Sequence, residues 1–296
     1  MTDAAAATGE YQQASDLPLD SHLHTDLSPD SDVPIDVYAA QAVERRIPEL
    51  AITDHVDFDP RAPAYAYATF ETRERSVREA AERWASHGLA IRFGCELTYE
   101  RRHEDEIRAH LARHRYDFTI GSVHIGPDSP YRSERVEAFV AGRSLREIVA
   151  PYFEDVEGAA RSGLFDTVGH LDFVKRYLMP FVPPAALAAA PELYEPILRA
   201  LVETGTGLEV NVSGLRQSPG ETYPPEAIVA RFRELGGTRV TTGSDAHRAE
   251  WFAFALDAGY RIAAAAGFRS LAFRRGGAPV EIAIPDALAP VAHALS

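Results

Sequence analysis

The sequence predicts an α/β barrel, one domain in which parallel strands alternate with helices. Two observations support this fold class. Short apolar runs alternate with longer segments of helical periodicity, which is the rhythm of a parallel sheet or barrel. No Pro/Gly/Ser-rich linker divides the 296 residues, and one α/β barrel routinely fills a chain of this length.

The elements follow from these patterns in chain order. Strands are predicted at 17–22, 50–53, 90–97, 118–123, 167–169, 208–211, 238–242 and 270–273. Helical patterns occupy the spaces between them, at 35–45, 70–87, 104–114, 145–162 and 225–235. We expect a flexible N-terminal segment at 1–16 and a single barrel domain at 17–296.

Composition narrows the function classes. The hydrophobic share of 46% and charged share of 25% are typical of a soluble globular protein, and no apolar run is long enough for a membrane span. The Ala-rich start has no basic region or long apolar core, so it does not resemble a signal peptide, and we expect a cytoplasmic protein. A net charge of −14 disfavours nucleic acid as a partner, whereas small phosphorylated substrates remain possible. Whether the chain forms a homo-oligomer stays open.

Cysteine use restricts the kind of metal site. Cys95 is the single cysteine, which excludes an internal disulfide and a Cys-rich zinc site. Any metal ion would therefore be held by His, Asp and Glu, and two or three divalent ions would reverse the local charge.

Such residues recur where the predicted strands end. Since the carboxyl ends of parallel barrel strands open on one face, these side chains are expected to converge there. They are His22, His24, Asp54, His55, Glu96, His124, His170, Asp245 and His247. The remaining histidines, which are His87, His103, His110, His114 and His293, resemble solvated helix positions.

The pair His22-Leu-His24 is the first of these groups. On an extended segment both imidazoles point to the same side, where they can clamp a metal ion. Alone, such a pair is more often two polar residues on an exposed strand face. Its recurrence with Asp54-His55 and Asp245-Ala-His247 at other strand ends favours the metal site. Glu96 ends an apolar run, where a carboxylate needs a partner, and bridging two ions would satisfy it.

Basic residues follow two of the same strands. Lys175 and Arg176 come after the His170 strand, and Arg216 follows the strand at 208–211. Arginine suits bidentate capture of phosphate oxygens, so these three are candidate substrate-binding residues. A surface salt bridge is the alternative for Arg176 and for Arg216. Phosphate-binding loops, dinucleotide-binding glycine motifs and the serine elbow are absent from the sequence.

Taken in order, these residues resemble the polymerase and histidinol phosphatase (PHP) superfamily of metal-dependent phosphoesterases, most closely its histidinol-phosphatase branch. The resemblance runs from Asp20 to about His247. Its motifs are Asp20-x-His22-x-His24-Thr-x-x-Ser28-x-Asp30, Ile52-Thr-Asp-His55, Gly94-x-Glu96, Ile120-Gly-Ser-Val-His124, Gly169-His170-Leu-Asp172, Glu209-Val-Asn211-x-Ser213-Gly-Leu-Arg216 and Gly243-Ser-Asp245-Ala-His247.

The resemblance implies a distorted (β/α)7 barrel with three divalent metal ions, usually zinc, manganese or iron. Carried over by position, one ion is held by His22, His24, Glu96 and Asp245. A second is held by Asp30, His55 and His247, and a third by Glu96, His124 and His170, with Glu96 bridging. Many relatives have His in place of Asp30, and Asp26 or Asp32 are alternatives at this position.

The implied activity is hydrolysis of a small phosphate monoester, most specifically of L-histidinol phosphate. The ions would activate water, and Asp245 or His247 would pass a proton to the leaving alkoxide, so Glu96, Asp245 and His247 are the expected catalytic residues. The segment 125–131 lacks the aromatic-rich loop common in histidinol phosphatases. This leaves open a nucleotide, sugar phosphate or phosphodiester as substrate, and whether 125–143 is a lid. An amidohydrolase is disfavoured because no lysine lies at a suitable strand end. A catalytically silent metal-binding domain is disfavoured by the complete ligand set.

Overall fold

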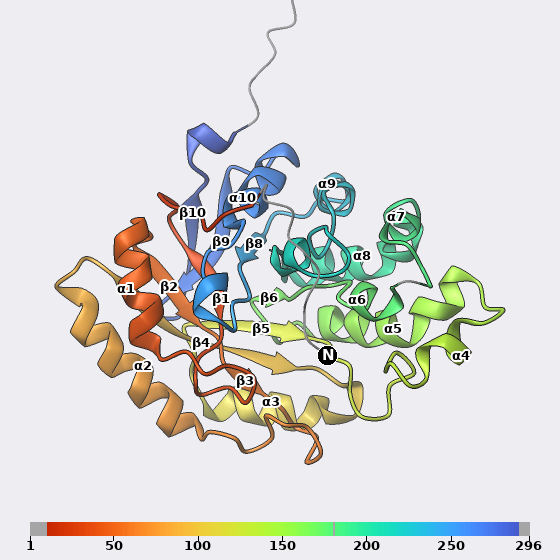
Figure 1. Ribbon diagram of the computed structural model, residues 1–296, viewed down its shortest axis with the longest axis horizontal. Coiled ribbons are helices and arrows are strands. Elements are labelled where there is room, and N and C mark those ends of the chain that lie inside the picture. Colours follow the sequence, from red (N-terminus) through yellow and green to blue (C-terminus); the bar gives the residue numbers. More distant parts are fainter. Residues whose placement is uncertain (1–10, 180, 290–296) are drawn as a thin grey trace, which may run out of the picture.

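The strands form a nearly closed parallel barrel (Figure 1), so the predicted fold class is confirmed. The computed structural model describes residues 11–179 and 181–289. Neighbouring barrel strands are all parallel. In spatial order they are β1 (Asp20–Leu23), β2 (Glu49–Ile52), β4 (Ala90–Thr98), β5 (Phe118–Ser122), β6 (Thr167–Val168), β7 (Gly207–Asn211) and β8 (Val240–Gly243). A short strand β3 (His55–Val56) pairs with the carboxyl half of β4.

Closure of the barrel occurs at its carboxyl end. The amide of Asp245 donates to the carbonyl of His22 at 2.9 Å, and the amide of His24 donates to the carbonyl of Ala246 at 3.0 Å. The backbone that carries the first predicted ligands is therefore bonded directly to the backbone that carries the last.

Helices surround the strands (Figure 1). Each predicted helix is confirmed, with ends shifted by at most two residues: α1 (Ile35–Arg45), α2 (Phe70–Ala85), α3 (Glu104–Arg113), α5 (Leu145–Ser162) and α9 (Glu226–Glu234). Further helices, which the patterns did not indicate, are α4 (Val136–Val140), α6 (Lys175–Leu178), α7 (Pro184–Ala188), α8 (Glu195–Thr204) and α10 (Leu256–Ala265). Short 3-10 turns occur at Arg101–His103, Pro191–Leu193, Ser213–Arg216, Ala249–Trp251 and Asp286–Leu288.

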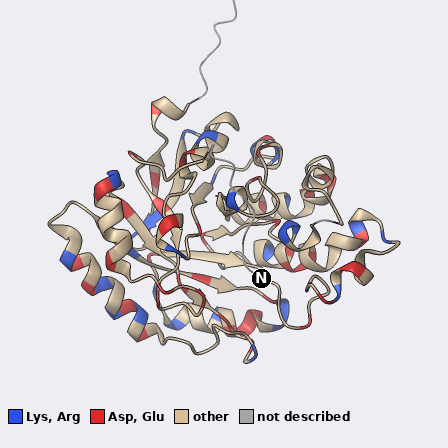
Figure 2. Ribbon diagram, in the orientation of Figure 1, with Lys and Arg blue, Asp and Glu red and all other residues tan. Residues whose placement is uncertain are grey.

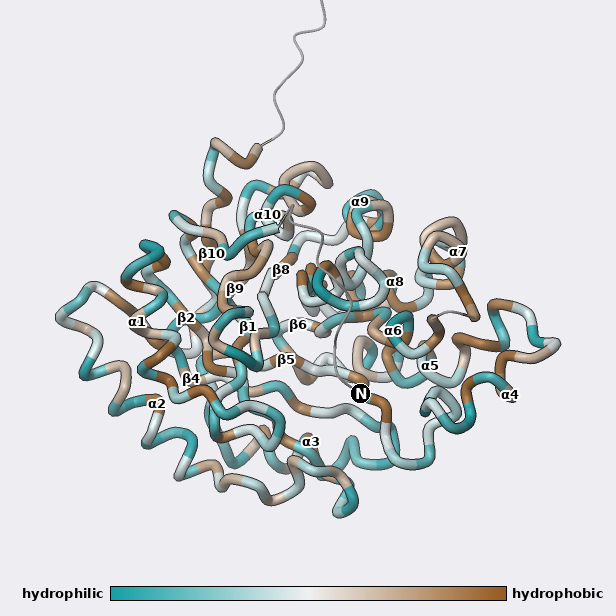
Figure 3. The backbone as a smooth tube through the Cα atoms, in the orientation of Figure 1, coloured by the Kyte–Doolittle hydropathy of each residue, from teal (hydrophilic) through white to brown (hydrophobic). Residues whose placement is uncertain are grey.

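Local chemistry explains where the helices begin and which face they bury. At the start of α5, Ser144 and Glu147 form a reciprocal capping box, and Gly163 ends the helix with a φ of 61°. Charges of both signs run along α2 (Figure 2), and this outer helix is largely hydrophilic (Figure 3). Only its inner face is buried, through Arg73, Val77 and Ala80. Among the described residues, no helix is long and apolar enough to cross a membrane.

The run predicted as a strand at 270–273 is β9 (Ser270–Arg275), and it lies outside the barrel sheet. It pairs antiparallel with β10 (Ala278–Ala283), which the patterns did not indicate. The two-residue loop Gly276-Gly277 has positive φ at both positions, which is the turn that returns a chain on itself. Arg275 bonds Glu49 and Arg274 bonds Asp166, so the hairpin contacts the amino end of the barrel.

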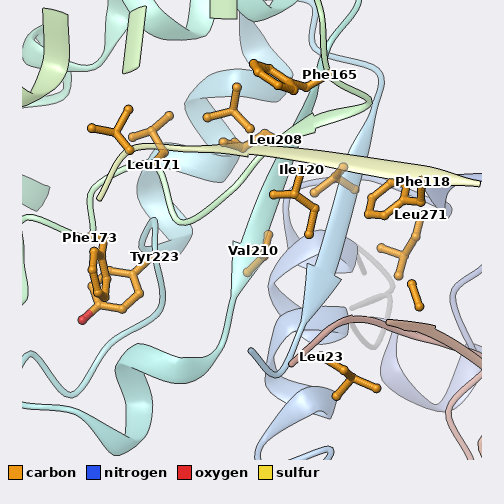
Figure 4. Packing of buried hydrophobic residues seen from close by; sticks show 14 of the residues in the cluster. Leu23, Phe118, Ile120, Phe165, Leu171, Phe173, Leu208, Val210, Tyr223 and Leu271 are labelled. Carbon is orange, nitrogen blue, oxygen red and sulfur yellow. The ribbon is translucent and has the colours of Figure 1, made fainter. Parts of the chain in front are cut away.

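Buried apolar side chains lie on both faces of the barrel strands. Figure 4 shows Leu208 and Val210 of β7 and Ile120 of β5 among these side chains, and all three are fully buried. Alternate residues of one strand share a face, so Leu208 and Val210 lie on the face of β7 opposite to Glu209, whereas Ile120 lies on the same face of the sheet as Glu209. Burial of each contributes about 1.5–3 kcal/mol to folding. This packing fixes the strands that carry the polar groups described below.

Two further predictions concern the N-terminal segment and the histidines expected on helix surfaces. In the segment predicted as flexible, Ala14 donates to the carbonyl of Ala253 at 2.8 Å, and Gln12 accepts from the amide of Ala255 at 2.8 Å. Residues 1–10 lie outside the described residues, so the boundary at residue 16 stays a prediction. His110, expected on a solvated helix surface, is half-buried beside Tyr116, and His293 is outside the described residues.

Candidate metal centre

The predicted ligands gather at the carboxyl end of the barrel. His22 and His24 lie at the end of β1, His55 begins β3, and Glu96 lies near the end of β4. The loops after β5, β6 and β8 carry His124, His170 and the Asp245/His247 pair. Residues from six strands and their loops thus converge on one site, as the strand-end pattern predicted.

Glu96 lies at the middle of this cluster and is fully buried. Its Oε2 is 3.4 Å from Nε2 of His22, 3.3 Å from Nε2 of His24 and 3.0 Å from Nδ1 of His55. Its Oε1 is 2.8 Å from Nε2 of His170 and 3.4 Å from Nε2 of His124. One carboxylate is therefore shared by five imidazoles.

This donor set fits divalent metal ions. Nε2 of His22 and Nε2 of His24 lie 3.0 Å apart and point at each other. If both rings are neutral, at most one of these two nitrogens can carry a proton. Three groups hold their nitrogen and oxygen atoms within 4.8 Å of one another. They are His24/His55/His247, His22/His24/Glu96 and His55/Glu96/His124. Imidazole nitrogens combined with carboxylate oxygens suit zinc, iron and manganese.

Asp30 is the acid of its loop that reaches the cluster. Its Oδ2 is 3.3 Å from Nε2 of His55 and 3.4 Å from Nε2 of His247. For the alternatives Asp26 and Asp32, the structure gives no contact with these imidazoles. The geometry therefore selects Asp30 among the three.

Asp245 holds its place through an unusual backbone conformation. Its φ of 52° lies in the left-handed region, which costs free energy for a residue with a side chain. There, its Oδ1 is 3.5 Å from Nε2 of His24 and 3.4 Å from Nδ1 of His247. The strained backbone turns the carboxylate into the cluster.

In the metal-free cluster, the pKa of each group is set by its burial and by the charges of its neighbours. Burial raises the pKa of Glu96, but the charges of His22, His124 and His55 outweigh it and hold the pKa well below its usual range. Burial lowers the pKa of His22, yet Glu209, Glu96 and Asp245 raise it well above normal. Burial, His247 and His55 all lower the pKa of His24. The metal-free cluster thus keeps its carboxylates ionised and His24 neutral, whereas His22 must release a proton when it binds a metal ion.

Glycines allow the close approach of these segments. A Cβ on Gly243 would lie 2.2 Å from Cβ of His22. A Cβ on Gly169 would lie 2.3 Å from Oγ of Ser122. A side chain at Gly243 would therefore displace the strand that presents His22, and one at Gly169 would collide with Ser122 of β5.

Asp54, which the sequence placed at a strand end with His55, supports the loop beyond β1. Its Oδ1 accepts from the Thr25 amide at 2.6 Å and from Ser28 Oγ at 3.0 Å. Ser28 Oγ in turn accepts from the amide of His55 at 2.9 Å. This network ties the His24 loop to the His55 strand.

The candidate phosphate-binding residues separate into two groups. Arg176 and Arg216 line a cavity of about 470 Å³ above the cluster, but Lys175 does not. The Arg216 guanidinium donates to the carbonyls of Ser244 and Asp245 at 2.8 and 2.6 Å. It therefore also holds the loop that carries Asp245.

Lys175 requires a correction, because the structure directs it away from the cavity. Its side chain is 1% exposed, and its Nζ is 2.9 Å from Oδ2 of Asp172 and 2.7 Å from Oε1 of Glu221. The ammonium forms ion pairs with two carboxylates inside the fold, so this position does not support a substrate-binding role.

The segment 125–143 reaches the cavity at its first residue. Ile125 lines the cavity together with Phe173 and Trp251. Farther along, Tyr131 is buried and its hydroxyl donates to the carbonyl of Ile148 at 2.6 Å. Asp128 pairs with Arg61 of the neighbouring loop at 2.6 Å. The start of the segment is thus part of the cavity wall.

Sequence reasoning quoted Glu209 of β7 only as part of a motif and gave it no role, although it lies beside the cluster. It is fully buried, and its Oε1 is 2.6 Å from Nδ1 of His22. A carboxylate inside the apolar run Leu208-Glu-Val210 was the available signal, by the same argument that singled out Glu96.

The family model and the known proteins that match this chain agree with one another. The sequence matches the PHP domain over residues 20–213. A probable histidinol-phosphatase of Deinococcus radiodurans is 30% identical over 259 residues, which cover 86% of this chain and 96% of that protein. The histidinol-phosphatase of Bacillus subtilis is 26% identical over 262 residues, covering 81% and 97%.

A solved structure shares the fold. It is histidinol phosphate phosphatase from Lactococcus lactis, crystallised with zinc, L-histidinol and phosphate. The TM-score is 0.75 at 24% sequence identity, and the alignment covers 89% of this chain and 98% of that one.

Proposed function

The chain belongs to the PHP domain family, and we propose that it is a metal-dependent histidinol-phosphatase that hydrolyses L-histidinol phosphate to L-histidinol and phosphate. The observation that carries this proposal is the fully buried Glu96, with five imidazole nitrogens within 3.4 Å of its two oxygens. The names of the relatives support the choice of substrate.

Three divalent ions, zinc, manganese or iron, are proposed for the cluster. The first would be bound by His22, His24, Glu96 and Asp245, the second by Asp30, His55 and His247, and the third by Glu96, His124 and His170. Support comes from the three ligand groups within 4.8 Å and from the zinc found with the Lactococcus lactis protein. Bound ions of this kind supply Lewis acidity, which neutralises phosphate oxygens and lowers the pKa of water.

Arg176 and Arg216 face the same cavity and are proposed to bind the phosphate. A planar guanidinium donates two parallel hydrogen bonds to phosphate oxygens and can stabilise the charge that develops there. Arg216 also orders the Asp245 loop through the carbonyls it binds, so its two roles act on the same side of the site.

Asp245 and His247 are proposed for proton transfer. The pKa of Asp245 lies below its usual range, because the charges of His22, His247 and His24 outweigh the effect of burial. An ionised carboxylate accepts a hydrogen bond from the attacking water and can therefore orient it. His247 Nδ1 lies 3.4 Å from Asp245 Oδ1, so His247 is placed to pass a proton toward the leaving alkoxide.

The rest of the cavity fits a cationic and aromatic leaving group. Asp57 lies two residues beyond His55 and lines the cavity with Phe173 and Trp251. A carboxylate attracts the ammonium of histidinol, and aromatic rings pack against its imidazole. This combination favours histidinol phosphate over an anionic sugar phosphate.

The test is release of inorganic phosphate by metal-reconstituted protein. L-histidinol phosphate is compared with a panel of nucleotide and sugar phosphates, with the His22→Ala variant as control. A strong preference for L-histidinol phosphate that disappears in the variant supports the proposal. Equal or better turnover of another phosphoester would assign the cavity to that substrate instead.

A further inference from the structure

Glu209 contacts the proposed metal ligands without belonging to them. It lies in β7, and its carboxylate is fully buried among hydrogen-bond donors from two other segments and from Asn211 of the same strand. We propose that Glu209 is a positioning residue, which fixes the orientation of His22, His170 and Asp245 for metal binding. This inference rests on the proposed function, because it assumes that those three residues bind metal.

The contact with His22 determines which ring nitrogen is available. Oε1 of Glu209 lies 2.6 Å from Nδ1 of His22. An ionised carboxylate can only accept a hydrogen bond, so the proton must be on Nδ1. In the singly protonated ring, which is the form that binds metal, the lone pair of Nε2 is then left on the side that faces His24 and Glu96. A histidine that binds metal through one nitrogen is commonly oriented in this way by a carboxylate at the other.

The second oxygen acts on two more ligands. Oε2 accepts from the amide of His170 at 2.8 Å and from Nδ2 of Asn211 at 3.1 Å. The same Nδ2 lies 3.3 Å from Oδ2 of Asp245. Asn211 Oδ1 accepts from the amide of Ser213 at 2.9 Å, which fixes the orientation of the Asn211 amide. Glu209 therefore reaches Asp245 through one side chain.

A role in fold stability does not account for this carboxylate. Among the described residues, no lysine or arginine pairs with it, and His22 is its one charged partner. Burial of a carboxylate without a permanent cation is unfavourable for folding. Glu49 provides the contrast: it is 3% exposed at the amino end of β2, and its carboxylate bonds Arg92 and Arg275. Glu49 therefore forms ion pairs with two arginines, whereas Glu209 contacts the proposed metal ligands.

The experiment compares Glu209→Gln with Glu49→Gln as the matched control. Zinc affinity is measured on the full chain by competition with a chromophoric chelator, and folding of the metal-free protein is followed by circular dichroism and thermal unfolding. We expect zinc affinity to fall roughly 10–100-fold in Glu209→Gln. Glu49→Gln should lower the unfolding temperature while zinc affinity stays at the wild-type value. The visible absorption of the cobalt-substituted protein should change only in the Glu209 variant.

Glu209→Asp extends the test if Glu209→Gln does not fold. Aspartate keeps the charge but is one methylene too short to span the distance to His22, so it too should weaken zinc binding. Wild-type affinity in a folded Glu209 variant would overturn the positioning role, as would an equal loss of affinity in Glu49→Gln. Failure of the proposed function is distinguishable, because it would appear as absent zinc binding or absent phosphate release in the wild-type protein.

Discussion

Oδ2 of Asp30 lies 3.3 Å from Nε2 of His55, although Asp30 belongs to the loop after β1 and His55 begins β3. The same oxygen is 3.4 Å from Nε2 of His247. The carboxylate side chain is 51% exposed, so it closes the solvent side of a site whose other ligands are mostly buried.

Asp30→Ala should remove one ion and leave the fold intact. The two imidazoles lose their common carboxylate, while an exposed side chain contributes little to packing. We expect zinc content to fall by about one ion per chain and phosphate release to fall at least roughly 10–100-fold. Metal analysis beside the activity assay measures both. Asp32→Ala, an exposed neighbour, is the control, and a loss of zinc there instead would reassign the ligand.

Glu96→Gln should have the larger effect. The neutral amide of glutamine lacks the negative charge of the carboxylate that contacts five imidazoles, and it cannot bridge two cations. We therefore expect loss of two ions per chain and a loss of activity of more than about 100-fold. Metal content and phosphate release are compared with Glu106→Gln, an exposed glutamate on α3. Full metal content with retained activity would refute the bridging role of Glu96.

Lys175→Met and Arg176→Met should separate stability from substrate binding. Removing Lys175 leaves Asp172 buried without its cation, which should lower the free energy of unfolding by about 3 kcal/mol. Arg176→Met should instead raise KM for the phosphoester roughly 10–100-fold, since a hydrogen bond to a charged group is lost. Urea unfolding and steady-state kinetics on both variants make the comparison. A raised KM in folded Lys175→Met would restore the substrate role that its burial opposes.

His110 should make stability depend on pH. Burial, together with the positive charges of His114, Arg73 and Arg113, lowers its pKa to about 4. The unfolded chain then binds more protons than the folded chain between about pH 6.5 and pH 4. Stability should therefore decrease as the pH falls through this window. The decrease should be smaller in His110→Gln, as measured by urea unfolding at pH 7 and pH 5. The exposed His87→Gln serves as control, and an unchanged pH dependence in His110→Gln would contradict the assignment.

The sequence by itself determined the barrel and the places of the proposed metal ligands along it. Parallel strands with apolar runs put their carboxyl ends on one face, so His22, Glu96 and Asp245 could be assigned to one site without coordinates. Helical periodicity located α1 and α5, because it is a pattern that acts over a few residues.

Tertiary structure alone decided where the side chains point and what they meet. The resemblance assigned Asp30 but left Asp26 and Asp32 as alternatives, and only the path of the loop after β1 brings Asp30 to His55. Lys175 and Arg176 are neighbours, yet α6 turns one toward Asp172 inside the fold and the other toward the cavity. The carboxylate of Glu209 contacts His22, which is 187 residues away in the chain. Contacts of that range depend on how strands pack around the barrel, which no local pattern encodes.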